Sequence, residues 1–176
     1  LSSSLICSIR PLRFVTGLCV CQQCTALLIS SARYDAKIPM PVPLIYHDDY
    51  SPEFPADHRF PMDKFRLLRD HLVESGLTQD ARLLRPELCP VDILALAHDP
   101  AYIERYMAGE LAREDQRRLG LPWSEALARR TVRAVGGSLL AAEQALEHGL
   151  ACHLAGGTHH AHYDHPAGFC IFNDLA

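Results

Sequence analysis

The sequence lacks several features that would place it in a special class of protein. It has no uninterrupted apolar run of about 18 residues, so it predicts no transmembrane helix. Basic residues are not in excess, because 17 Lys and Arg stand against 21 Asp and Glu, and the net charge is −4. It contains no internal repeat or low-complexity tract. The length of 176 residues and the hydrophobic content of 48% fit one ordinary globular domain. We therefore expect neither direct nucleic-acid binding nor a membrane partner.

Residues 1–34 contain no acidic residue, which sets them apart from the remainder of the chain. Four of the seven cysteines also fall there: Cys7, Cys19, Cys21 and Cys24. A signal or transit peptide is one interpretation of a basic segment without acids. The Cys19-x-Cys21-x-x-Cys24 spacing could instead bind a metal, but no second half-site accompanies it. We interpret residues 1–42 as a poorly ordered or targeting-like extension, followed by a domain at 43–176.

The odd number of cysteines, seven in all, argues against a disulfide framework. Their scatter through the remainder of the chain indicates a reducing compartment. We therefore expect a cytoplasmic protein.

A short apolar run, residues 150–155, is bounded by glycine on both sides. This pattern predicts a buried strand of a parallel sheet. Gly156 and Gly157 then allow a sharp turn, after which His159 and His160 leave the sheet on a loop. In α/β folds, ligands bind where loops leave the carboxyl ends of strands, so the position of this histidine pair indicates a site.

The longest predicted helix covers residues 124–148 and precedes this strand directly. Ser124 is a suitable N-cap, and Gly149 is a suitable residue to end the helix. Gly136 and Gly137 each cost the helix about 1 kcal/mol relative to alanine, so a close contact between helix and sheet must offset them. Shorter helices are predicted at 62–75, 91–97 and 100–108, and a strand at 44–47.

Half of the ten histidines lie in the last 26 residues: His153, His159, His160, His162 and His165. Asp164 lies among them. Because imidazole and carboxylate are good zinc ligands, the segment by itself could be a metal cluster. His153 stands within the apolar run, where a hydrogen-bonded core histidine is the simpler interpretation.

The spacing of the C-terminal motifs carries a resemblance to a known family. Gly156-Gly157-Thr158-His159-His160-Ala161 is followed, after six residues, by Gly168-Phe169-Cys170 and then by Asn173-Asp174. Further matching stretches are Ile45-Tyr46-His47, His58-Arg59-Phe60-Pro61-Met62, His98-Asp99-Pro100-Ala101-Tyr102 and Gly120-Leu121-Pro122-Trp123-Ser124. Together they resemble the histone deacetylase superfamily, which contains zinc-dependent deacetylases and acetylpolyamine amidohydrolases on an arginase-like fold. The resemblance covers about residues 43 to 176 and is closest to the bacterial or class IV-like branch.

The resemblance implies a role for each matching residue. His159 and His160 correspond to the active-site pair that acts as general base and acid and does not bind the metal. The carbonyl of Gly168 would accept the amide N–H of an acyl-lysine, and the ring of Phe169 would line a wall of its tunnel. Cys170 would be a buried thiol, and Asn173-Asp174 a structural pair. His162, Asp164 and His165 fall in a variable loop segment.

The zinc ligands of the family come from an Asp-x-Asp-x-His motif that this sequence does not contain. The resemblance therefore implies a zinc cofactor whose ligands lie beyond residue 176, with no metal ligand within the chain. We expect the N-terminal half of a deacetylase, inactive alone, whose fold is a truncated three-layer α/β/α structure with a mainly parallel sheet of arginase–deacetylase type.

The expected function of the complete protein is hydrolysis of an N-acetyl amide, on acetyl-lysine or an acetylpolyamine, by zinc-activated water. One alternative is a non-catalytic fragment or pseudoenzyme that binds acylated ligands. Another is an arginase-type hydrolase. It is disfavoured because that group is expected to place an Asp-His ligand pair where His159 and His160 stand.

Overall fold

The computed structural model describes residues 19–20, 27–30 and 42–176 of the chain. Within these residues a four-stranded sheet has the order β1-β2-β4-β3. Its strands are β1 (Cys19–Val20), β2 (Leu27–Ser30), β3 (Leu44–Ile45) and β4 (Leu150–His153). The α-helices are α1 (Lys64–Glu74), α2 (Val91–Ala97), α3 (Pro100–Met107), α4 (Arg113–Leu119) and α5 (Glu125–His148). Two short 3-10 helices are η1 (Asp48–Tyr50) and η2 (Asp80–Arg82).

The sheet of the described residues is mixed. Strands β3 and β4 run parallel, with Ile45 opposite His153, as predicted for the buried apolar run. The other edge of β4 pairs antiparallel with β2, which pairs antiparallel with β1. The parallel arrangement predicted for most of the sheet is thus found between β3 and β4, whereas β1 and β2 add antiparallel neighbours.

Strands β1 and β2 come from the segment that we interpreted as an N-terminal extension, and the rest of residues 1–41 lies outside the described residues. Cys21 and Cys24 of the cysteine motif are among those undescribed residues. The division into an extension and a domain therefore stays a prediction.

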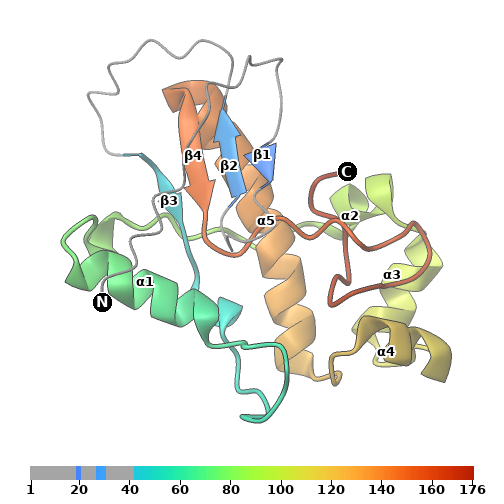
Figure 1. Cartoon of the computed structure of the whole chain (residues 1–176). Helices are drawn as coiled ribbons and strands as arrows, with labels where there is room; N and C mark the ends of the chain where they lie inside the picture. Colours follow the sequence, from blue (N-terminus) through green and yellow to red (C-terminus); the bar gives the residue numbers. More distant parts are fainter. Residues whose placement is uncertain (1–18, 21–26, 31–41) are drawn as a thin grey trace.

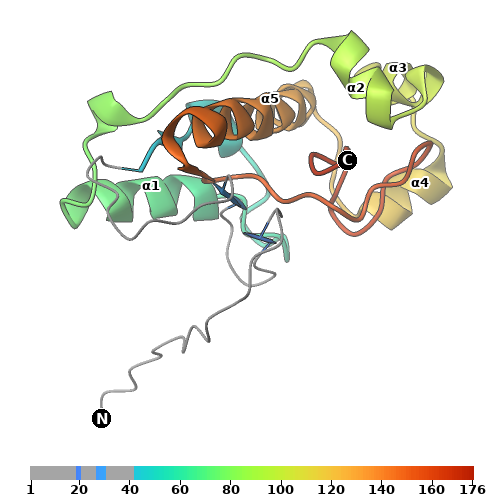
Figure 2. The ribbon, with the colours of Figure 1, turned by 90° about the horizontal axis from the view of Figure 1, so that it is seen from above.

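Helices lie on both sides of β3 and β4 (Figures 1 and 2). The long helix α5 runs along one face of the sheet, and α1 lies on the opposite side of β3. Helices α2, α3 and α4 gather beyond the sheet, and the chain after β4 passes between them and α5 without forming a further helix (Figure 1). Within the described residues, no helix is both long and apolar enough to cross a membrane.

Helix α5 begins and ends where its sequence predicts. The Ser124 side chain accepts the backbone N–H of Leu127 at 3.1 Å, and so satisfies a donor that the first helical turn leaves unpaired. The helix ends at Gly149, whose φ of 84° is a left-handed conformation that glycine adopts without strain.

The two glycines in the middle of α5 lie where the helix contacts the rest of the fold most closely. A Cβ on Gly136 would overlap the backbone carbonyl of Glu87, and a Cβ on Gly137 would lie 2.6 Å from Cε1 of His153 and overlap the Tyr50 hydroxyl. The expected close contact between helix and sheet is therefore confirmed, since His153 belongs to β4.

Two ion pairs fasten η1 to α5. The Asp49 carboxylate accepts hydrogen bonds from Nε of Arg129 at 2.9 Å and from Nε of Arg133 at 3.1 Å. Burial alone would raise the pKa of Asp49, but these hydrogen bonds hold it below its ordinary value. Because Tyr50 is the last residue of η1, this attachment also fixes Tyr50 against the helix.

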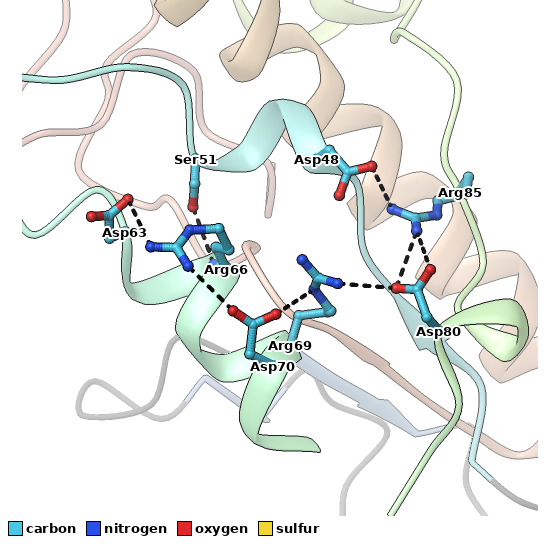
Figure 3. A network of polar contacts seen from close by, with 8 residues as sticks. All are labelled: Asp48, Ser51, Asp63, Arg66, Arg69, Asp70, Asp80 and Arg85. Atoms are coloured by element: carbon cyan, nitrogen blue, oxygen red, sulfur yellow. Dashed lines mark hydrogen bonds and ion pairs between the residues drawn. The ribbon is translucent and has the colours of Figure 1, made fainter. Parts of the chain in front are cut away.

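A second set of ion pairs lies at the surface beside β3 and joins η1, α1 and η2 (Figure 3). Arg85 contacts Asp48 and Asp80, and Arg69 contacts Asp70 and Asp80. Exposed pairs of this kind contribute little stability individually, about 0–1 kcal/mol. Their main effect is geometric, because they tie α1 to η2 and, through Arg85, to η1, which follows β3.

The chain after β4 is held mainly by buried polar contacts. The Tyr102 hydroxyl donates to the Ile171 carbonyl at 2.6 Å. The buried His98 ring lies 3.3 Å from the Tyr163 carbonyl through Nδ1 and accepts the Asn173 N–H at Nε2, 2.9 Å away. Because a carbonyl can only accept, Nδ1 carries the proton, and one neutral ring joins Tyr163 to Asn173.

The contact at Gly137 gives a direct stability prediction. We expect Gly137→Ala to lower the free energy of unfolding by about 2–3 kcal/mol, because the added methyl must displace His153 or Tyr50. Gly76→Ala is the control: that site is open but has a φ of 72°, so only backbone strain of about 1–2 kcal/mol is expected. Urea denaturation measures both. A Gly137→Ala protein as stable as wild type would show that the close contact is absent.

Candidate active site

The histidine pair lies on the loop that leaves β4. His159 and His160 are exposed, and the centroids of their rings are 4.2 Å apart. Nδ1 of His159 is 2.9 Å from the Gly157 carbonyl, which can only accept, so Nδ1 is the donor. A neutral His159 therefore carries its free lone pair on Nε2. The loop thus presents one defined proton acceptor with a second imidazole beside it.

A tight turn at residues 167–170 faces the histidine pair. Its two central residues have positive φ, 54° at Gly168 and 68° at Phe169, and the Cys170 N–H donates to the Ala167 carbonyl at 2.8 Å. These features define a type I′ turn. A Cβ on Gly168 would lie 3.4 Å from Cγ of His160, so the turn and the pair are direct neighbours.

Phe169 adopts a left-handed conformation that costs a residue with a side chain about 1–3 kcal/mol. Two backbone hydrogen bonds to the end of α4 hold it there: Gly168 N–H to the Arg118 carbonyl at 3.2 Å, and Phe169 N–H to the Leu119 carbonyl at 3.0 Å. A Cβ on Gly120, the residue that caps the end of α4, would lie 3.3 Å from the Phe169 ring. A glycine at this position therefore leaves room for the ring.

The Phe169 ring belongs to an aromatic group that the loop before α1 supplies. Its centroid is 5.3 Å from that of Phe60 and 6.3 Å from that of His58, and the Arg59 guanidinium lies over it at 4.7 Å. The same loop lines a cavity of about 400 Å³ that includes His58 and Phe60. The predicted wall residue is thus part of a larger aromatic surface next to the histidines.

Asp174 fixes the backbone before the histidines. Its Oδ2 accepts the Gly157 N–H at 3.1 Å and the Ser138 hydroxyl at 2.6 Å, and its Oδ1 contacts the Thr158 hydroxyl at 2.9 Å. Burial raises the pKa of Asp174, and these hydrogen bonds oppose that rise. Asn173-Asp174, predicted as a structural pair, includes the carboxylate that organises the Gly-Gly turn.

His153 is fully buried beneath the loop, as predicted for a core histidine. Its Nε2 lies 2.8 Å from the Tyr50 hydroxyl and its Nδ1 lies 3.2 Å from the Ser138 hydroxyl. Burial, with a smaller contribution from the nearby Arg130 guanidinium, lowers the pKa of His153 to about 3. The ring is therefore neutral at physiological pH.

The structure brings the four predicted site residues, His159, His160, Gly168 and Phe169, to one place. Their catalytic and binding roles remain predictions. His162 and Asp164 are exposed, as expected for a loop, and the His162 and His165 rings stack with centroids 4.3 Å apart. Cys170 is buried, which raises the pKa of its thiol, as expected for an inert position.

Zinc is the cofactor that the resemblance implies, and a protein zinc site needs three or four ligands at one point. Among the residues that the structure describes, no group of three or more His, Cys, Asp and Glu side chains could hold a metal ion. The described residues therefore do not make a zinc site by themselves.

Comparison with known proteins decides the family. Residues 58–176 match the histone deacetylase domain. The chain belongs to the histone deacetylase family. It is 51% identical over 137 residues to an uncharacterized protein of Picosynechococcus sp., covering 78% of this chain and 46% of that protein. It is 32% identical over 133 residues to the acetoin utilization protein AcuC of Staphylococcus xylosus, covering 70% of this chain and 34% of that protein.

Solved structures confirm the α/β fold of the arginase–deacetylase type. A histone deacetylase homolog from Aquifex aeolicus superposes with a TM-score of 0.59 at 22% identity, covering 77% of this chain and 39% of that one. The HD domain of HDA15 superposes with a TM-score of 0.54 at 18% identity. The chain spans less than half the length of these relatives, so the activity of the whole protein is a matter for proposal.

Sequence reasoning did not predict the hydrogen bonds through which Tyr50, Ser138 and His98 support the site. Each acts through a hydrogen bond to a residue far away in the chain, which no local pattern reports. The sequence held one signal, the Gly136-Gly137 pair, which marks a close approach to α5 and directly precedes Ser138.

The low pKa of His153 predicts a pH-dependent stability. The ordinary pKa of an unfolded histidine is about 6.5, so between that pH and about 3 the unfolded state binds a proton that the folded state does not. The contribution of the neutral His153 ring to the free energy of unfolding is complete above pH 6.5. As the pH falls below that value, this contribution decreases by about 1.4 kcal/mol per pH unit.

We expect urea denaturation of wild type at several values between about pH 4 and 5.5 to show this slope. The slope should decrease by that amount in His153→Asn, which cannot titrate. Comparing the two proteins cancels the contributions of other groups, such as His98, whose pKa is also lowered by burial. Equal slopes would show that His153 titrates normally in the folded protein.

Proposed function

We propose that the protein containing this chain hydrolyses N-acetyl amides, with acetyl-lysine or an acetylpolyamine as substrate. The observation that carries the proposal is the exposed His159-His160 pair beside the Gly168-Phe169 turn, within residues that match the histone deacetylase domain. Family membership favours this activity over an arginase-type reaction.

The aromatic group beside the histidines supports a substrate with an apolar stem. Phe169 and Phe60 offer flat apolar surface, against which the methylene chain of a lysine or polyamine can pack. In this proposal the Gly168 carbonyl accepts the amide N–H and so sets the position of the acetyl group relative to the histidines.

Amide hydrolysis needs one group that accepts a proton from the attacking water and one that gives a proton to the leaving amine. The histidine pair supplies both. Nε2 of a neutral His159 is free to accept a proton, because Nδ1 is held by the Gly157 carbonyl. His160 lies between His159 and the Gly168 turn, where the leaving nitrogen of the proposed substrate would sit.

We propose zinc as the cofactor, with ligands at positions that the family resemblance places beyond Ala176. When bound, zinc would polarise the amide carbonyl as a Lewis acid. The family resemblance assigns the histidine pair proton transfer and no part in holding the metal, and the described residues contain no complete metal-binding group by themselves.

The test uses the complete protein with His159→Ala and His160→Ala made separately. Each should lower kcat on an acetyl-lysine peptide by about 10²–10⁴-fold, the usual contribution of proton-transfer catalysis, while zinc content stays at the wild-type value. His162→Ala, an exposed histidine of the same loop, is the matched control and should keep the wild-type rate.

Loss of zinc from the His159 or His160 variant would show that the pair binds the metal. An unchanged kcat in both would show that the pair does no chemistry. A wild-type protein that binds acetyl-lysine peptide without hydrolysing it would favour the alternative of a non-catalytic acyl-binding protein.

A further inference from the structure

Four side chains from separate segments form a continuous buried chain of hydrogen bonds between α5, β4 and the active-site loop. Tyr50 of η1 contacts Nε2 of His153 at 2.8 Å, and Nδ1 of His153 contacts the Ser138 hydroxyl at 3.2 Å. The Ser138 hydroxyl donates to Oδ2 of Asp174 at 2.6 Å. The exposed fractions of Tyr50, His153 and Ser138 are 0%, 0% and 5%, so water does not compete for the two contacts of His153, and the contact of Ser138 with Asp174 is partly buried.

The direction of every hydrogen bond in this chain follows from its Asp174 end. Oδ2 of Asp174 accepts the Gly157 N–H, so it acts as an acceptor. The Ser138 hydroxyl therefore donates its single proton to Oδ2. The Ser138 oxygen can then only accept, which puts the His153 proton on Nδ1. Nε2 is left with a lone pair and accepts from the Tyr50 hydroxyl.

The fold makes room for this chain at one point. A Cβ on Gly137 would overlap both Nε2 of His153 and the Tyr50 hydroxyl, so their contact requires a glycine there. The ring of His153 contacts Tyr50 and Ser138, and burial, together with the positive charge of Arg130, lowers the pKa of the ring and keeps it neutral. A neutral ring with one donor and one acceptor is what the chain needs.

The chain ends on the backbone that carries the histidine pair. Asp174 accepts the Gly157 N–H, and its own N–H donates to the Thr158 carbonyl at 3.1 Å. Gly157 in turn holds Nδ1 of His159 through its carbonyl. Any shift of the Asp174 carboxylate therefore moves the two residues that directly precede the pair.

We propose that Tyr50, His153, Ser138 and Asp174 form a positioning chain that sets the conformation of the Gly157–His160 loop. These residues touch no reacting atom and act on the reaction through His159 and His160. The effect of these residues on catalysis rests on the proposed function. Their effect on the conformation of the loop does not, and can be measured without an activity assay.

The first experiment needs no variant. A long-range ¹H–¹⁵N spectrum of the 176-residue chain identifies which nitrogen of the His153 ring carries the proton. We expect protonation at Nδ1 and an unprotonated Nε2. Protonation at Nε2 would reverse the hydrogen bonds and overturn the proposal.

The second experiment interrupts the middle of the chain with Ser138→Ala, which removes one hydroxyl and adds no volume. Its matched control is Ser124→Ala, which removes the N-cap hydroxyl of the same helix, a group that bonds the Leu127 N–H and is not part of the hydrogen-bonded chain. We expect hydrogen exchange of the Gly157 amide to become at least about tenfold faster in Ser138→Ala than in Ser124→Ala when the two are compared at equal global stability. Equal exchange in the two variants would mean that Ser138 has only a general structural role.

The third measurement uses the complete protein and separates kcat from KM. Small misplacement of catalytic groups costs up to about 10²-fold, so we expect kcat of Ser138→Ala to fall about ten- to hundredfold with KM within about twofold of wild type and with zinc content unchanged. Ser138→Cys, which keeps a weak donor, should fall between Ser138→Ala and wild type. A wild-type kcat in Ser138→Ala would overturn the proposal.

His159→Ala in the same assay keeps the two proposals distinguishable. If His159→Ala is impaired and Ser138→Ala is not, the positioning chain is wrong and the catalytic pair stands. If His159→Ala keeps full activity, the catalytic role of His159 is wrong, and if wild type does not hydrolyse the peptide, the proposed function is wrong. In both cases the His153 proton and the Gly157 exchange rate still decide the positioning chain. If Ser138→Ala does not fold, Tyr50→Phe provides the test. In that variant the proton on Nδ1 of His153 should remain, and the ¹⁵N chemical shift of Nε2 of His153 should change.

Discussion

The close approach of α5 to β4 is the constraint on which the rest of this structure depends. Two glycines in mid-helix cost about 2 kcal/mol of helix propensity, and each stands where a methyl group would collide with backbone or with a buried side chain. At Gly137 the missing side chain leaves just enough room for the His153 ring and the Tyr50 hydroxyl to meet. The same site thus provides both close packing of α5 and a hydrogen bond between two buried polar side chains. Such a bond is needed there because buried polar groups must find partners wherever water is excluded.

That contact determines how the active-site loop is supported. The segment after β4 has no helix or strand to fix it, yet it carries the histidine pair. Its conformation is maintained instead by polar side chains: Asp174 of the segment itself at the Gly-Gly turn, and buried His98 at the end of α2, between Tyr163 and Asn173. Because His98 is buried and Asp174 is partly buried, their hydrogen bonds are costly to break and the loop is held firmly.

Much of the site could be predicted from the sequence, for physical reasons that are local. The caps of α5 are recognisable because Ser124 and Gly149 act within one helical turn of themselves. The roles of His159, His160 and Phe169, by contrast, were predicted only because their motifs resemble those of the histone deacetylase superfamily. The antiparallel strands β1 and β2 were not predicted, and neither were the roles of Tyr50, Ser138 and His98. Their partners lie between 15 and 103 residues away in the chain, so nothing in their immediate neighbours reports them.

Four histidines in this region show how environment divides one residue type into two uses. His98 and His153 are 1% and 0% exposed, and in both the geometry requires a neutral ring that donates at Nδ1 and accepts at Nε2. Burial makes this state stable, because charging the ring without solvent would be costly. His159 and His160 are exposed and free to exchange protons with a substrate or water, which is what acid–base chemistry near neutral pH requires. The buried pair supplies fixed geometry, and in the proposed function the exposed pair supplies proton transfer. Neither role could be exchanged between them, because a ring that holds a loop through both nitrogens has no free nitrogen for catalysis.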